Sequence, residues 1–148
     1  MNKIYAFLII IPLIAVLFFK TLTFYEYDTK QRFVKNVVDS VAHKVMITGV
    51  MTVRDREELG EKLGKLGTFG AGNISIKCGN VQPDGTVGGL GDYVLGSVLD
   101  RGEIFSIYVE SENASIFSEM EVNSDDEGNG LHYRAKATCR VEKISRED

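Results

Sequence analysis

The sequence predicts an α+β protein in which one long N-terminal helix packs on a small antiparallel β-sheet. The first 48 residues contain no glycine and carry helical patterning, whereas all 15 glycines lie at or after Gly49. Three later segments alternate between apolar and polar side chains, as half-buried strands do. A helix laid against such a sheet is the simplest architecture that buries both apolar faces.

The chain has 148 residues, and its charge is unevenly distributed. No acidic residue precedes Glu26, and the residues from Thr21 onward carry 15 basic and 21 acidic side chains, a formal net charge of −6. About 125 residues remain after an N-terminal apolar segment, which is enough for one domain with a modest core. A negative domain of this kind argues against general nucleic-acid binding, which requires a positive surface.

The N-terminal apolar segment, Ile4–Phe19, contains no charged residue. Its sixteen residues are slightly short for a membrane span of about 20 residues. Lys20 can extend its ammonium group to the headgroups, and Thr21–Tyr25 lengthens the stretch to a plausible span. We therefore predict a transmembrane and assembly helix over residues 1–25, followed by an extracytoplasmic domain over residues 26–148.

Two other interpretations of the apolar segment are a cleaved signal peptide and a buried core helix. Residues Phe18–Leu22 are bulky where a signal peptidase requires small side chains, and the segment is apolar all round, so we favour a retained span. Lys3 lies on one side of it, whereas Lys20, Lys30 and Arg32 lie on the other, so the positive-inside rule does not set the orientation. We place the amino terminus inside on the strength of its terminal position and the two cysteines.

Beyond the span, apolar residues recur with the spacing of an amphipathic helix. The apolar stripe comprises Phe33, Val34, Val37, Val38, Val41, Ala42, Val45 and Met46. Helix can therefore run from about Lys3 to Thr48, roughly 70 Å at 1.5 Å per residue. A break around Tyr27–Asp28 remains an alternative.

The residues that follow predict one short helix and three strands. Thr52–Asp55 resembles a capping box that opens a helix over Asp55–Leu66. The strands are expected at Asn73–Cys78, Glu103–Glu110 and Leu131–Val141, separated by the irregular stretches Gly79–Gly102 and Ser111–Gly130.

Cys78 and Cys139 both fall on the apolar face of their predicted strands. Two inward residues on neighbouring strands can form a disulfide when their Cα atoms approach within about 7 Å. We therefore predict an intrachain disulfide in an extracytoplasmic compartment. Two cysteines alone do not make a zinc site, which requires four ligands.

The sequence contains no convincing catalytic or cofactor motif. His43 and His132 fall on predicted solvent faces, and Gly88–Gly91 neither follows a strand nor opens a helix. The acidic stretch Asn123–Asn129 lacks the spacing of a calcium-binding EF-hand loop. The row His132, Arg134, Lys136 and Arg140 is typical of a solvated sheet face. We expect no enzyme, cofactor or metal site.

The whole layout resembles type IV pilins, and more closely the TadE-like pilin-related proteins of Tad-type secretion and conjugation clusters. The resemblance rests on Phe33–Gly49, on the short helix Glu57–Leu63, and on the Gly-Asp segment and strands that follow. Such pilins carry a glutamate a few positions inside the apolar helix, but no acidic residue lies in Ile4–Phe19. This departure argues against processing by a prepilin peptidase.

The resemblance implies a structural subunit of a surface filament or of its assembly apparatus, with copies of itself and other pilin-like proteins as partners. The residues expected to carry assembly are Ile4, Leu8, Ile11, Val16, Phe19, Lys20 and Glu26. In a polymer, we expect Lys20 to pair with Glu26 or Asp28 of an adjacent subunit. The alternative functions are a membrane-anchored binding module and a small membrane subunit that stabilises a complex.

Overall fold

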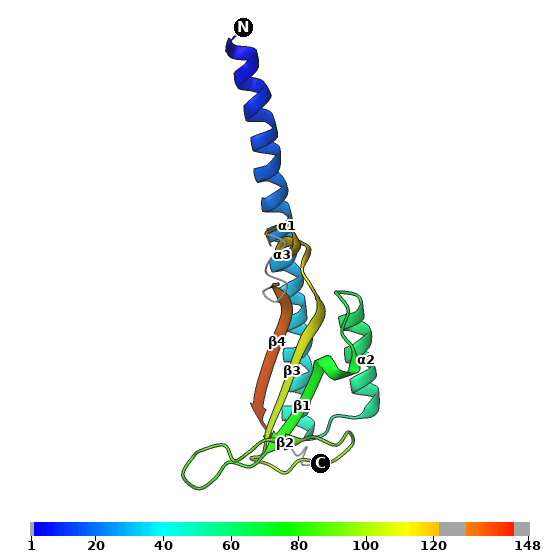
Figure 1. Cartoon of the computed structure of the whole chain (residues 1–148). Helices are drawn as coiled ribbons and strands as arrows, with labels where there is room; N and C mark the ends of the chain where they lie inside the picture. The colour runs from blue at the N-terminus through cyan, green and yellow to red at the C-terminus, as the bar shows by residue number, and fades with distance from the viewer. Residues whose placement is uncertain (1, 122–129, 144–148) are drawn as a thin grey trace.

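The computed structural model describes residues 2–121 and 130–143 and forms an elongated α+β molecule, as predicted (Figure 1). One helix extends along most of the length of the molecule, and a small sheet packs against its C-terminal half. The described elements are α1 (Asn2–Thr48), α2 (Val53–Gly64), a 3₁₀ turn η1 (Ala71–Asn73), β1 (Ile74–Gly79), β2 (Gly91–Asp92), β3 (Ile104–Ala114), α3 (Ile116–Glu121) and β4 (His132–Arg140).

The described part of the sheet has four strands in the order β2-β1-β3-β4, with every neighbouring pair antiparallel. Helix α1 packs chiefly on β4 and β3 and also contacts α2. Ala135 and Ala137 of β4 lie on the face of the sheet that packs against the helix. Their small side chains allow the helix backbone to come close to the strand. These packed layers confirm the predicted fold class.

The core stripe of α1 is narrower than the sequence pattern predicts. Val34, Val38, Ala42 and Val45 are buried, whereas Val37, Val41 and Met46 are only partly buried. Phe33, which the pattern assigned to the stripe, is exposed. It precedes Val34 by one residue, which turns its side chain about 100° around the helix and away from the sheet.

Helix α1 is continuous, so the alternative of a break around Tyr27–Asp28 is wrong. The helix ends at Thr48 because Gly49 adopts φ +73°, a left-handed conformation that glycine tolerates and that commonly terminates helices. Residues beyond β4 then bond to the helix end: the Glu142 N–H donates to the Met46 carbonyl at 2.9 Å. The Met46 carbonyl near the end of α1 is thus paired with the domain rather than left free.

Helix α2 begins with the predicted capping box. The Asp55 N–H donates to Thr52 Oγ1 at 3.2 Å, and the Thr52 N–H donates to Asp55 Oδ2 at 2.9 Å. Asp55 also accepts a hydrogen bond from Lys44 of α1. Leu59 and Leu63 of α2 are fully buried. The start of α2 is therefore tied to α1 by an ion pair, and its apolar face is buried in the core.

Two elements lie in stretches that the sequence pattern left irregular. Strand β2 pairs with β1 inside Gly79–Gly102, and α3 lies inside Ser111–Gly130. Strand β3 also runs four residues further than predicted, to Ala114, with a shift of register after Glu110. The acidic stretch Asn123–Asn129 lies outside the described residues.

The predicted disulfide between Cys78 and Cys139 is wrong in this fold, and both thiols are free. Cys78 of β1 and Cys139 of β4 each pair with Phe105 of β3, the strand that lies between them. Two strands apart is about 9.5 Å, beyond the roughly 7 Å that a disulfide spans between Cα atoms. The prediction correctly placed both cysteines on the inner face but assumed that their strands were neighbours.

Candidate functional site

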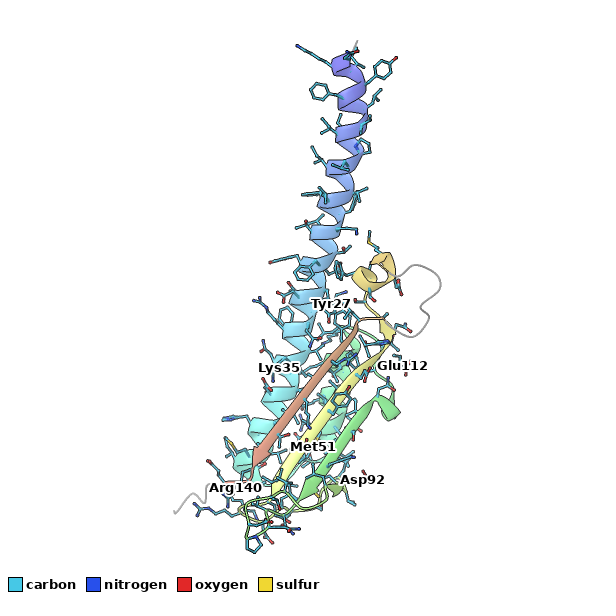
Figure 2. The ribbon with its side chains drawn as sticks, turned by 60° about the vertical axis from the view of Figure 1, so that its left-hand side comes forward. Tyr27, Lys35, Met51, Asp92, Glu112 and Arg140 are labelled. Carbon is cyan, nitrogen blue, oxygen red and sulfur yellow. The ribbon has the colours of Figure 1, made fainter. Side chains whose placement is uncertain are left out.

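The most distinctive surface of the molecule is the N-terminal half of α1, Asn2–Phe24, called here the apolar half. All its large apolar side chains are between 47% and 66% exposed, apart from Ile9 at 70%. Figure 2 shows these side chains projecting from every side of the helix, clear of the sheet. The helix is long and apolar enough to span a membrane, by length and composition.

The five apolar side chains among the predicted assembly residues all lie in the apolar half. They fall within an arc of about 140° around the helix and are all exposed: Ile4, Leu8, Ile11, Val16 and Phe19. Such a surface is larger than the isolated apolar patches found on soluble monomers, so it needs lipid or protein to cover it. The structure places these residues along one continuous helix, clear of the sheet.

The two threonine hydroxyls within the apolar half are compatible with an apolar environment. The Thr21 hydroxyl donates to the Leu17 carbonyl at 2.9 Å, and the Thr23 hydroxyl donates to the Phe19 carbonyl at 3.0 Å. These bonds satisfy both hydroxyls within the helix. Pro12 cannot donate the hydrogen bond that its position would direct to the Leu8 carbonyl, yet α1 continues through it.

An aromatic cluster marks the point where the apolar half meets the domain. The Phe117 ring of α3 packs edge-on against Phe24, with ring centroids 5.4 Å apart. The Tyr27 ring stacks on those of Phe117 and Tyr133, with ring centroids 6.4 Å and 5.4 Å apart, respectively. Figure 2 shows Tyr27 at the end of the sheet nearest the apolar half. The part of α1 from Tyr27 to Thr48, called here the packed half, is held by the domain.

Charged side chains form ion pairs along the helix directly after the apolar half. Glu26 pairs with Lys30 at 2.7 Å, and Asp28 pairs with Arg32 at 2.9 Å, each one helical turn apart. The hydrogen bond to Glu26 raises the pKa of Lys30, although burial acts in the opposite direction. An intersubunit contact between Lys20 and Glu26, as the sequence predicts, would therefore compete with an existing partner of Glu26.

The outer face of the sheet carries a second candidate site, a groove of about 660 Å³. Lys77 of β1, Tyr108 of β3 and Lys136 of β4 line its floor, and the glycine-rich segment 87–90 forms one side. Tyr108 donates a hydrogen bond to Glu110 at 2.5 Å. The glycine-rich segment thus shapes a groove, a role that sequence reasoning missed because the segment has no regular pattern.

The remaining polar candidates do not form a recognisable reaction centre. His43 is exposed, while His132 is half-buried and its Nδ1 lies 2.9 Å from the Ser111 carbonyl oxygen. Burial raises the pKa of both thiols, and the nearby Glu103 carboxylate adds to the effect at Cys78. A raised pKa leaves a smaller fraction of each thiol as the reactive thiolate at neutral pH. Among residues 2–121 and 130–143, no group of three or more His, Cys, Asp or Glu side chains is placed to hold a metal ion.

Comparison with known proteins assigns no family. No protein-family model matches the chain, and no significant match is found among curated proteins or solved structures.

Proposed function

We propose that the protein is a membrane-anchored structural subunit that polymerises through the apolar half of α1, in the manner of type IV pilin-like and TadE-like proteins. The observation that carries the proposal is an apolar rod, exposed along its whole length, that continues without interruption into the packed half. In this proposal the membrane holds the subunit before assembly, and sister helices cover the same surface afterwards.

The dimensions of the helix support a membrane-spanning state. Ile4–Phe24 rises about 30 Å, the thickness of the hydrocarbon core of a typical bilayer. The charged pairs that begin at Glu26 and Asp28 then fall just outside that thickness. The end of the apolar half packs against α3, so the proposed span is joined to the domain by a packed contact and not by a flexible linker.

The unbroken helix supports the assembly step. Because α1 crosses from the apolar half to the packed half without a hinge, packing of one apolar half against another fixes the domains relative to each other. Repeated head-to-tail packing of identical subunits gives an open helical filament when the rotation does not close. The partners proposed are copies of this chain and other pilin-like proteins, and no nucleic acid is expected.

The second candidate function is a single-pass membrane-anchored binding module. The groove on the outer sheet face favours it, because Lys77 and Lys136 offer two cationic groups beside hydroxyl donors. Both functions need the anchor, so polymerisation is the property that separates them.

The deciding experiment measures polymers directly. Cells expressing the protein are sheared, and the sheared and membrane fractions are compared by sedimentation and electron microscopy. The proposal expects sedimentable filaments that contain this chain. A protein that is monodisperse in mild detergent and absent from the sheared fraction contradicts the filament and leaves the anchored binding module.

Retention of the apolar half is tested by the intact mass of the mature protein. The proposal expects a mass that includes Ile4–Phe19, because Phe18–Leu22 offers no small-residue cleavage site and lies within α1. A mature start at or beyond Thr21 contradicts both the anchor and the filament.

Orientation needs a separate test, since the free thiols remove the disulfide argument for an oxidising compartment. We propose that the domain lies outside the cytoplasm. A variant that lacks Cys78 and Cys139 and carries Val94→Cys places one thiol at an exposed position in a loop. A membrane-impermeant maleimide should label it in intact cells; labelling only after lysis reverses the orientation.

A further inference from the structure

Helix α3 lies at the end of the domain nearest the apolar half of α1 (Figure 1). The contact between Phe117 and Phe24, at 5.4 Å between ring centroids, fixes α3 at the level of Phe24 along α1. Phe24 is the last residue of the apolar stretch of about 30 Å that begins at Ile4. In the membrane-anchored state, α3 is therefore at the height of the lipid headgroups.

One face of α3 that does not pack on α1 is apolar and open, and the exposed Glu119 lies beside it. Ile116 and Met120 are four residues apart, so they lie on the same face of the helix, and they are 53% and 49% exposed. Leu131, which is 45% exposed, is tied to this helix: its N–H donates to Ser118 Oγ at 2.7 Å, and its carbonyl accepts from the Ser115 N–H at 2.8 Å.

The base of α3 is held firmly enough to present these side chains. Ser115 and Ser118 are buried, and both contribute to the bonds with Leu131. The Phe117 ring packs against Phe24 and Tyr27 of α1. Helix α3, which carries the exposed apolar side chains, is thus packed on α1, the helix that contains the proposed span.

We propose that Ile116 and Met120 form a membrane foot, a surface that inserts into the boundary between lipid headgroups and acyl chains beside α1. This inference rests on the proposed membrane anchor and extends it to the domain. We assign lipid as the partner of the foot because the foot lies beside the apolar half of α1, at the height where the hydrocarbon core of the bilayer ends. Helix α3 carries no basic residue but does carry Glu119, so the proposed contact depends on its apolar side chains and does not require anionic lipid.

The foot has a mechanical consequence. A single span leaves a domain free to rotate and tilt over the bilayer, whereas a second contact beside the span restricts both motions. The foot therefore holds the domain against the membrane in one orientation before any assembly.

The chain contains no tryptophan, so a single introduced tryptophan gives an unambiguous depth signal. The full-length Met120→Trp variant is reconstituted in phosphatidylcholine vesicles that carry bromine either near the headgroup or deep in the acyl chain. Leu13→Trp in the apolar half reports on the anchor, and Val94→Trp in an exposed loop is the unquenched control. Ile116→Trp provides a second reporter on the same face of α3.

The foot predicts that shallow bromine quenches Met120→Trp and Ile116→Trp more than deep bromine does, with emission shifted to the blue relative to Val94→Trp. Quenching of Leu13→Trp without quenching of the two α3 variants overturns the foot and leaves the anchor standing. An unquenched Leu13→Trp overturns the anchor itself. Protection of the Met120→Trp variant from both bromine and aqueous iodide indicates a second copy over α3 and also overturns the lipid contact.

Discussion

The two halves of α1 are one continuous helix with opposite surroundings. In the packed half, four small apolar residues at helical spacing are buried against the sheet, and the remaining positions are largely polar. In the apolar half, apolar side chains lie on every side of the helix and every large one is exposed. Helix formation alone therefore does not distinguish the two halves. What differs is the partner that each surface requires: the domain's own sheet for one, and a bilayer or sister helices for the other.

The largest expected effect comes from a charge in the packed half. Val38→Asp places a carboxylate at a fully buried position beside the sheet, and we expect it to cost more than about 4 kcal/mol and to unfold the domain. Limited proteolysis in detergent measures the loss. Asn36→Asp, at an exposed position on the same helix, should leave protease resistance unchanged. A folded Val38→Asp domain would contradict the described packing.

The same change in the apolar half should leave the domain folded and abolish its attachment. Val16→Asp lies near the centre of the span, where an aspartate costs about 3 kcal/mol of insertion free energy. We expect loss of the protein from membrane and filament fractions, with total expression measured in parallel. Val53→Asp, at an exposed position in α2, is the matched control. Retention of Val16→Asp in both fractions would show that the apolar half is not the attachment surface.

A charge pair that joins α1 to α2 should have a smaller effect that depends on pH. Burial alone would raise the pKa of Asp55, but hydrogen bonds from Lys44 and Thr52 outweigh it and lower the pKa. The stabilisation is therefore complete above the unfolded pKa of about 3.9 and is lost as pH falls through that value toward the folded pKa. We expect Asp55→Asn to cost about 1–2 kcal/mol at pH 7 and progressively less in acid.

Denaturant unfolding in detergent at pH 7 and at pH 3 measures this difference. Glu58→Gln removes one partner of an exposed pair with Arg54 and should change stability little at either pH. An equal cost of Asp55→Asn at both pH values would contradict the role of the ionised carboxylate.

The smallest effect should come from reduction. Because Cys78 and Cys139 are separated by β3, we expect two reactive thiols per chain after denaturation without reductant, and slow labelling in the folded state. A disulfide closing a loop of about sixty residues would contribute roughly 4 kcal/mol to the free energy of unfolding. Because both thiols are free, we expect reductant to leave the unfolding midpoint unchanged. A loss of stability on reduction, with no free thiol beforehand, would contradict the strand order.

Much of the architecture could be predicted because it depends on local patterns. The glycine-free stretch and the apolar periodicity predicted α1 to within a residue at each end, and the capping box predicted the start of α2. Alternation located the three main strands and their inner faces. The five apolar assembly residues were correctly placed on one helix for the same reason, since no distant contact is needed to expose them.

Features that depend on which segments become neighbours could not be predicted in this way. Alternation shows which face of a strand is buried but not which strand lies beside it, so Cys78 and Cys139 were paired across a gap that β3 occupies. Helix α3 is too short for a helical period, and β2 has only two residues, so neither has a readable pattern. Local sequence patterns are enough to predict an apolar helix attached to an α+β domain. The position of α3 and its exposed side chains, where that helix meets the domain, depends on tertiary contacts, because Phe117 and Phe24 meet only after the chain has folded back along α1.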